Sequence, residues 1–471
     1  MILNILIAAF TSLFTLSSKS FLIDEIFSVQ FAHSNQFLNT MWFREFNMWL
    51  YYVLLHFWLL LGKSEFIVRL PSAIFAVAAI PFIFKTTEYI YDKRVARLAT
   101  FLTAINLLFV FYAQEARSYS LALLLSSAST YLFVRLVLNK NKENYLLSFL
   151  YLLTSSLSVY AHVYSFLIIV AQGASLLFLP LRKYLKTIIV WMFLICLLIS
   201  PLIISPSFHS NQINWIPKPP ITSIIGTYYI LSGDFAPLFV LYIFVILAFF
   251  PWRNFNKWKT IFIPMLLTIP VITAFLFSIS IKPIYLSKYF IVLLPYLMAL
   301  VSMCFYRIRT KWLFKVVVIL SILLSAVRLS FWYTKIDVPG FTISNNNPDW
   351  RSSTNYLAAN SRIGDCAIFF TYIGIDDFKF YHTSPSPIPI EIASKPYTFN
   401  NGVELNIPEP DFKKLSGLSC STIWLVLNNH ANEGENRARH EKIEETLHIK
   451  YRLTKNVEFY QMQIEEWAIN K

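Results

Sequence analysis

Two adjacent carboxylates, Asp24 and Glu25, stand just after the first apolar segment of the chain. Ionised carboxylates beside a membrane are costly unless they are solvated or do chemistry. A carboxylate held at such a place can take a proton from a hydroxyl group and so make it a better nucleophile. The other interpretation is a solvated loop pair without a chemical role, and the local sequence leaves both open.

Cations stand at the ends of other apolar segments. Arg117 lies in the polar run 114–119, and two lysines, Lys282 and Lys288, flank the run 283–285. An arginine can hold a phosphate through two parallel hydrogen bonds, whereas a lysine offers a point charge. The competing interpretations are a surface pair of Glu115 with Arg117, and lysines that lie along the membrane with the ammonium group in water.

Histidines and cysteines give weaker signals. A lone histidine such as His33, His56 or His162 is more often a hydrogen-bonded residue than a metal ligand, so we expect no metal at these three, although a divalent metal stays open. The four cysteines lack zinc-type spacing. Cys366 and Cys420 are expected to form a disulfide if their domain lies outside the cytoplasm, with two buried free thiols as the alternative.

The elements that carry these residues belong to a membrane protein. The chain has 471 residues, of which 56% are hydrophobic and only 14% are charged. A soluble fold carries about 25% charged residues, so the bilayer must be the solvent for most of this chain. The net charge of +14 is spread over short clusters between apolar runs, which argues against a nucleic-acid partner.

Eleven apolar runs are near the length of roughly 17–25 residues that a membrane-spanning helix needs. They lie at 2–18, 68–84, 96–113, 119–138, 145–161, 164–181, 187–205, 236–250, 261–280, 289–306 and 312–332. We therefore expect a polytopic α-helical membrane domain over 1–333, followed by a small α/β domain over 334–471.

The basic residues predict which side each connection faces. Alternate connections carry about twice as many lysines and arginines as the others, and the positive-inside rule places the richer set in the cytoplasm. The N-terminus is then inside, and an odd number of crossings leaves the C-terminal domain outside. We expect a multi-pass protein of the inner (cytoplasmic) membrane, with Asp24, Arg117 and Lys288 all on its outer, periplasmic face.

Two outer loops are long. The first spans 17–67 and contains an apolar stretch, 49–61, that is too short to cross, so we expect helices along the membrane face at about 20–66. The second, 206–235, holds several prolines and is expected to be irregular. In the C-terminal domain we expect a helix at 351–360, strands at 366–371 and 422–427, a helix at 436–447 and two final strands.

Several short runs together resemble the C-type glycosyltransferase superfamily, in particular bacterial glycosyltransferase family 39, whose relatives include protein O-mannosyltransferases and the aminoarabinose transferase of lipid A. The matching runs are 24–25, 47–52 with His56, 69–72, 112–119, 215–217 and 349–351. Their order and spacing cover nearly the whole chain, so the resemblance is specific to the family but not to a substrate.

Proteins of this family transfer sugars from polyprenyl-phosphate carriers at the outer face of the membrane. The resemblance implies that Asp24 is the catalytic base, that Glu25 assists it, and that Arg117 lies near the donor phosphate. Many relatives have His-Pro-Pro where this chain has the run 47–49, and many have arginine where it has Lys288. Lysine keeps the positive charge but cannot make the bidentate hydrogen bonds that arginine makes to a phosphate.

The candidate residues divide into three groups. The catalytic pair is Asp24 and Glu25. The residues assigned to the donor phosphate are Arg117, Lys288, Glu115 and Tyr285. The residues assigned to substrate binding are Asn47, Tyr51, His56 and His162.

The resulting hypothesis is an inverting glycosyltransferase that moves a sugar from a polyprenyl-phosphate carrier to a lipid, a glycan or a protein. One alternative is a transporter or flippase of lipid-linked glycans. Transporters favour ionisable groups near mid-membrane and helices broken by glycine or proline in repeated halves, whereas this chain has only 10 glycines and its charges lie at helix ends. Another alternative is a non-catalytic protein of envelope assembly, which would not need Asp24 and Glu25.

Overall fold

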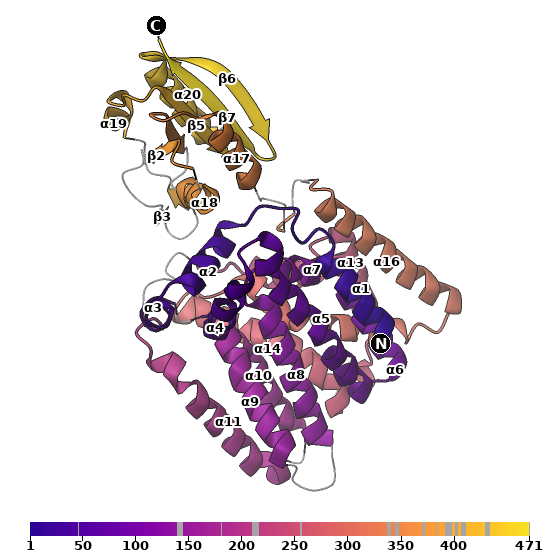
Figure 1. Cartoon of the computed structure of the whole chain (residues 1–471). Coiled ribbons are helices and arrows are strands. Elements are labelled where there is room, and N and C mark those ends of the chain that lie inside the picture. Colours follow the sequence, from indigo (N-terminus) through magenta and orange to yellow (C-terminus); the bar gives the residue numbers. More distant parts are fainter. Residues whose placement is uncertain are drawn as a thin grey trace. The chain divides into compact units, whose positions relative to one another are not determined.

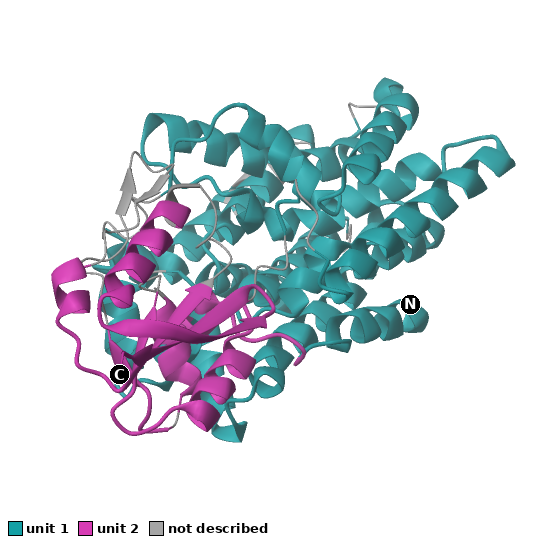
Figure 2. Ribbon diagram, turned by 90° about the horizontal axis from the view of Figure 1, so that it is seen from above, with its two compact units in different colours: residues 1–16, 28–345 teal, residues 17–27, 346–471 magenta. Residues whose placement is uncertain are grey.

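The computed structural model describes residues 1–45, 47–138, 145–179, 181–209, 216–254, 257–336, 341–343, 348–369, 373–382, 384–390, 398–400, 404–406, 411–428 and 434–470. Residue 215 and the end of the strand expected at 366–371 lie outside this part. The chain divides into two compact units (Figure 2). Unit 1 comprises Met1–Leu16 and Ser28–Asn345, and unit 2 comprises Ser17–Phe27 and Asn346–Lys471.

Unit 1 is helical (Figure 1). Its elements are α1 (Ile2–Leu13), the larger part of α2 (Ile23–His33), α3 (Phe37–Arg44), α4 (Trp49–Trp58), the 3₁₀ helix η1 (Leu59–Leu61), α5 (Glu65–Ile90), α6 (Lys93–Ala104), α7 (Leu107–Ala113), α8 (Tyr119–Leu138), α9 (Tyr145–Ala161), α10 (Ser165–Ser175), η2 (Leu176–Phe178), α11 (Leu181–Ile204), α12 (Thr222–Leu231), α13 (Ala236–Phe249), η3 (Trp252–Asn254), α14 (Trp258–Ser280), η4 (Ser287–Leu293), α15 (Leu294–Phe305) and α16 (Lys311–Tyr333).

Five helical spans in the described residues are long and apolar enough to cross a membrane: α5, α8, α14, η4 with α15, and α16. Two bent pairs, α6 with α7 and α12 with α13, raise this number to seven if each pair is one span. The chain is therefore a multi-pass helical membrane protein. The shorter apolar helices α1, α9, α10 and α11 fall on four more of the runs that the sequence singles out.

The bend of 59° between α6 and α7 arises at a polar residue inside an apolar run. The side-chain oxygen of Asn106 accepts a hydrogen bond from the N–H group of Leu108 at 2.8 Å, which caps a new helix. The amide group of Asn106 donates to the carbonyl group of Leu231 at 3.1 Å. The run expected as one straight span at 96–113 is thus two helices.

The expectation of an irregular loop at 206–235 is wrong in its second half, because α12 occupies Thr222–Leu231. The prolines of this loop that are described all precede α12: Pro206, Pro217, Pro219 and Pro220. Proline breaks a helix from within but is tolerated before its first turn, where no intrahelical N–H bond is lost.

A buried ion pair stands where α12 and α13 meet at 98°. Gly233 and Asp234 both have positive φ, which ends α12. The Asp234 carboxylate lies 3.0 Å from the guanidinium of Arg328 in α16, and both side chains are almost fully buried. The N–H groups of Thr342 and Ile343 also donate to this carboxylate, at 3.1 and 2.8 Å.

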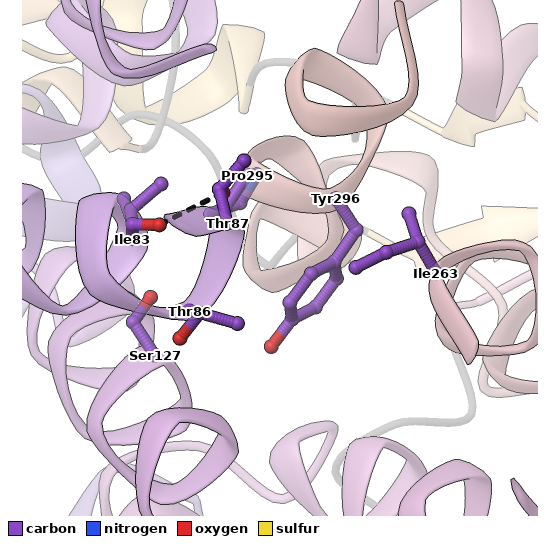
Figure 3. A pocket seen from close by; sticks show the side chains of 7 residues that line it. All are labelled: Ile83, Thr86, Thr87, Ser127, Ile263, Pro295 and Tyr296. Carbon is purple, nitrogen blue, oxygen red and sulfur yellow. Dashed lines mark hydrogen bonds between the residues drawn. The ribbon is translucent and has the colours of Figure 1, made fainter. Parts of the chain in front are cut away.

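Polar side chains inside the helical bundle satisfy one another. Ser129 of α8 bonds Ser155 of α9 at 2.7 Å, and Thr130 of α8 bonds Tyr296 of α15 at 2.6 Å. Such pairs hold helices together in lipid, where no water replaces a lost partner. A small cavity among α5, α8, α14 and α15 adjoins them; Tyr296 points into it (Figure 3). It has room for about one water molecule, far too little for a sugar.

Unit 2 contains a five-stranded mixed sheet in the order β2-β1-β5-β7-β6. Its strands β2, β1 and β5 run parallel, and β5, β7 and β6 pair antiparallel. The elements of the unit are the start of α2, α17 (Trp350–Asn360), β1 (Cys366–Phe369), α18 (Ile373–Tyr381), β2 (Ile388–Ile390), the separate pair β3 (Thr398–Asn400) and β4 (Glu404–Asn406), α19 (Phe412–Ser416), β5 (Thr422–Asn428), α20 (Gly434–His448), β6 (Tyr451–Phe459) and β7 (Met462–Ile469).

Helices cover both faces of this sheet. Ile423 and Leu425 of β5 share one buried core with Ile443 of α20, whereas the alternate residue Trp424 packs with Leu357 of α17 on the other face. This alternation explains why the central strands read as continuous apolar runs. Cys366 and Cys420 are joined by a disulfide with a Cα–Cα distance of 5.8 Å.

Candidate functional site

The two carboxylates lie in the first turn of α2 but differ in their surroundings. Glu25 is only 1% exposed, and its side chain accepts a hydrogen bond from the N–H group of Leu22 at 2.8 Å. A glutamate at the third helical position that reaches back in this way caps the helix. Asp24 is partly exposed. Glu25 therefore caps the helix from a buried position, whereas Asp24 is the more exposed of the two carboxylates.

Arg117 lies in the short connection between α7 and α8. Its guanidinium donates to the hydroxyl of Ser28 at 3.3 Å, and its carbonyl group accepts from the hydroxyl of Ser72 at 3.3 Å. Its N–H group donates to the carbonyl of the buried Glu115 at 2.8 Å. These contacts fix the backbone and aim of Arg117, while its side chain stays partly accessible.

Lys288 lies at the start of η4, far from Arg117 in the sequence. Its carbonyl group accepts a hydrogen bond from the phenol of Tyr112 at 2.8 Å, which ties η4 to α7. Its ammonium group lies 5.9 Å from the centre of the Tyr289 ring, and the side chain is exposed. An exposed lysine on a fixed backbone can meet an anion in solution or at a lipid headgroup.

His162 connects these residues. It lies between α9 and α10 and is buried, and its Nε2 atom is 3.3 Å from the side-chain nitrogen of Asn47. Burial, together with the positive charges of Arg117 and Lys288, lowers the pKa of His162 to about 3. The imidazole is thus neutral at physiological pH. The rings of Tyr119 and Tyr289, close in the sequence to the two cations, lie 5.5 and 4.9 Å from the ring of His162. The structure therefore brings together four separate segments, which carry Arg117, Lys288, His162 and Asn47. We call these four residues the cation cluster.

Three tyrosines that we did not assign to the site line the cation cluster. The ring of Tyr289 lies 4.9 Å from that of His162, 6.1 Å from that of Tyr119 and 5.1 Å from that of Tyr164. Two of the three follow a cation closely in the sequence, Tyr119 after Arg117 and Tyr289 after Lys288. A tyrosine one or two residues after each cation is the signal that could have identified these two.

Three other assigned residues, His56, Tyr285 and Tyr51, also lie in unit 1. The Nδ1 atom of His56 is 2.6 Å from the carbonyl oxygen of Ala32, and its ring stacks on Phe37 at 4.1 Å. Tyr285 bonds Thr227 at 2.6 Å. Tyr51 is 1% exposed. The substrate-binding roles of His56 and Tyr51 and the phosphate-binding role of Tyr285 stay predictions from the sequence.

Unit 2 contains a group with metal-binding residue types, separate from the candidate histidines. The Nε2 atom of His440 lies 3.4 Å from a carboxylate oxygen of Glu465 and 3.8 Å from one of Glu444. Burial alone would lower the pKa of His440, but the carboxylates, Glu465 first, outweigh it and raise this pKa. An ion pair within the unit accounts for this arrangement.

Comparison with known proteins supplies a family model and several structures. Residues 47–207 match the family model described as dolichyl-phosphate-mannose-protein mannosyltransferase. This range contains Asn47, Arg117 and His162 of the cation cluster. A comparison with curated protein sequences gives no match.

Three solved structures are similar to the chain. ArnT from Cupriavidus metallidurans bound to undecaprenyl phosphate has a TM-score of 0.62 and 11% identity, over 99% of this chain and 97% of ArnT. An oligosaccharyltransferase of Archaeoglobus fulgidus in complex with Zn and sulfate has a TM-score of 0.55 and 13% identity, over 99% and 72%. AglB of that organism, with an inhibitory peptide and a dolichol-phosphate, has a TM-score of 0.51 and 12% identity, over 96% and 72%. At these identities the similarity shows the fold.

Proposed function

We propose that the protein transfers a sugar from a polyprenyl-phosphate carrier to an acceptor, because residues 47–207 match the mannosyltransferase family model and the chain shares the fold of ArnT. ArnT was solved with undecaprenyl phosphate and AglB with a dolichol-phosphate. A polyprenyl-phosphate sugar is accordingly the donor class with which to test this chain. The acceptor is a lipid, a glycan or a protein.

The observation that supports this proposal most is that two segments carrying cations meet at the buried His162: the rings of Tyr119 and Tyr289, which closely follow the two cations in the sequence, lie 5.5 and 4.9 Å from the ring of His162. Arg117 and Lys288 come from segments that are far apart in the sequence, and both charges act on His162. Transfer leaves a polyprenyl phosphate with one more negative charge. Fixed cations stabilise that developing charge without having to rearrange. The ring of Tyr289, which is partly exposed and lies 4.9 Å from the ring of His162, offers an apolar surface to a sugar ring or the start of the lipid tail.

Asp24 is the proposed general base. A hydroxyl acceptor is a poor nucleophile at neutral pH, so a positioned carboxylate should take its proton as the bond to the anomeric carbon forms. Direct attack on that carbon inverts its configuration, because the phosphate leaves from the opposite side. Support for Asp24 over Glu25 is local to α2, where Glu25 is buried as a cap and Asp24 is accessible.

We also propose the finer topology. Eleven crossings are reached if α1, α9, α10 and α11 span the membrane beside the five long helices and two bent pairs. The distribution of basic residues then places the N-terminus in the cytoplasm and unit 2 on the periplasmic side of the inner membrane. A polyprenyl-phosphate sugar presented at the outer face would meet Arg117 and Lys288 there.

The test uses purified protein in detergent with a polyprenyl-phosphate sugar and a panel of acceptors. We expect Arg117→Ala and Lys288→Ala each to lower kcat/KM for the donor by about 10–100-fold, since each removes one charge from the phosphate site. Lys282→Ala is the control, because this lysine lies in the same connection, six residues before Lys288, and the proposal assigns it no role. We expect it to retain the wild-type kcat/KM.

The alternatives predict other results. A flippase would move lipid-linked glycans across vesicles without cleaving the sugar–phosphate bond, and an assembly protein would neither move nor cleave them. If donor turnover is found and Arg117→Ala leaves kcat/KM for the donor unchanged, Arg117 is not part of the phosphate site.

A further inference from the structure

The segment Ser17–Phe27 precedes most of unit 1 in the sequence but belongs to unit 2. Its first anchor is Ser20, which is only 2% exposed. The hydroxyl of Ser20 donates to the carboxylate of Asp349 at 3.2 Å and accepts from the N–H group of Arg351 at 3.1 Å. Ser20 is thus held at the beginning of α17 by both a donor and an acceptor.

Asp349, the N-cap of α17, and Arg351 in its first turn make further hydrogen bonds at this place. Asp349 also accepts from the N–H group of Ser352 at 3.1 Å and so caps α17. The guanidinium of Arg351 donates to the carbonyl group of Ser17 at 3.3 Å. The run 349–351 is one that the sequence singles out through its resemblance to the family, and the proposed reaction gives it no role.

A second anchor follows directly at Phe21, which is 1% exposed. Its N–H group donates to the phenol oxygen of Tyr381 in α18 at 2.8 Å. Its ring packs edge-on against Phe380 at 5.3 Å and lies 6.3 Å from the ring of Tyr381. One backbone hydrogen bond and two ring contacts therefore fix the position of the backbone and the orientation of the side chain at Phe21.

The backbone between Phe21 and Asp24 has little conformational freedom. Leu22 gives its N–H group to Glu25, and α2 begins at the next residue, so Asp24 stands on a capped helical turn three residues after Phe21. The backbone dihedral angles of a capped turn are fixed, so the position of Phe21 determines where the side chain of Asp24 lies.

We propose that unit 2 is the device that holds the catalytic carboxylate, and that Ser20, Asp349 and Tyr381 are positioning residues for Asp24. This inference rests on the proposed role of Asp24 as the base. It gives the run 349–351 a task, namely to fix the segment that carries Asp24. A base displaced by about 1 Å can lose up to roughly a hundredfold in rate, so loss of one anchor should lower turnover while donor binding remains.

The experiment compares Tyr381→Phe and Ser20→Ala in the full chain with the control Tyr451→Phe. The phenol of Tyr451 also makes a hydrogen bond inside unit 2, to the carbonyl of Cys420 at 3.1 Å, but not to the segment 17–27. We expect kcat to fall about tenfold in each of the two test variants, with the donor KM within about twofold of wild type. Tyr451→Phe should keep the wild-type kcat, and Ser20→Thr, which keeps a hydroxyl, should recover most of the loss.

Amide hydrogen exchange measures how firmly the segment 17–27 is held, independently of enzyme activity. Exchange of the amides at 20–26 should be faster in Tyr381→Phe than in wild type or in Tyr451→Phe. A wild-type kcat in the Tyr381→Phe, Ser20→Ala double variant would overturn the inference, and so would an equal loss in Tyr451→Phe. If Asp24→Asn turns over normally, the proposed base is wrong, and faster exchange at 20–26 would then show an anchored segment with another purpose.

Discussion

The disulfide between Cys366 and Cys420 yields a prediction that concerns both stability and location. The perturbation is the double substitution Cys366→Ala, Cys420→Ala, which keeps both buried positions apolar. The two residues are 54 apart in the sequence. Closing a loop of that length removes roughly 14 cal/mol/K of entropy from the unfolded chain, or about 4 kcal/mol at room temperature. Native-state relaxation makes about 2–4 kcal/mol the expected loss.

The assay is thermal unfolding of unit 2 within the purified full chain, followed by the fluorescence of its tryptophans or by hydrogen exchange of the sheet. We expect the melting temperature of this unit to fall by on the order of 10 °C. Cys196→Ala is the control, because Cys196 is an exposed free cysteine in α11 and its loss should leave unit 2 unchanged.

Peptide mapping of protein taken from the native envelope, with free thiols blocked first, decides whether the bond exists in the cell. Disulfides persist in the periplasm but are rare in the reducing cytoplasm. Recovery of Cys366 and Cys420 as a linked pair would support the outer location of unit 2. Recovery of both as free thiols would refute the bond in the cell and the entropy argument with it.

Two further predictions concern buried charges. Asp234→Ala leaves the guanidinium of Arg328 buried without its carboxylate, so we expect a loss of about 3–5 kcal/mol, measured as a lower melting temperature in detergent; a loss below about 1 kcal/mol would contradict it. Burial raises the pKa of Asp377 to about 8, so its contribution to stability is fully present below about pH 4 and is lost as the pH rises toward 8. Asp377→Asn should therefore raise the stability of unit 2 at pH 8 by roughly 1–3 kcal/mol and have little effect at pH 4, as followed by thermal melts at both pH values; equal effects at the two pH values would refute this assignment.

Much of the helical framework could be predicted because hydropathy alone decides it. The bounds of α8 and α9 coincide with the runs expected at 119–138 and 145–161, since both are continuous apolar stretches. The bend inside 96–113 and the helix α12 could not be predicted in this way. The first depends on the cap at Asn106, and the second on prolines that stand before a helix instead of inside it.

The charged residues of the candidate site could be predicted from the sequence, but the aromatic residues that surround them could not. Residue type and position along the chain single out Arg117, Lys288 and His162, and the structure brings the segments that carry them together. The ring contacts of Tyr289 and Tyr164 depend on how η4 and α10 meet, which no local pattern in the sequence contains. For the same reason the anchors of the segment 17–27 on α17 and α18, more than 300 residues later, could only be found in the structure.

The central claim is that Asp24 takes the proton of the acceptor in a sugar transfer, and turnover of Asp24→Asn tests it most directly. Asparagine keeps the size of the side chain and removes its basicity. With a polyprenyl-phosphate sugar and an acceptor both supplied to purified protein, we predict a fall of about 10²–10⁴-fold in kcat, with normal membrane insertion and unchanged donor binding. Wild-type turnover of this variant would contradict the account.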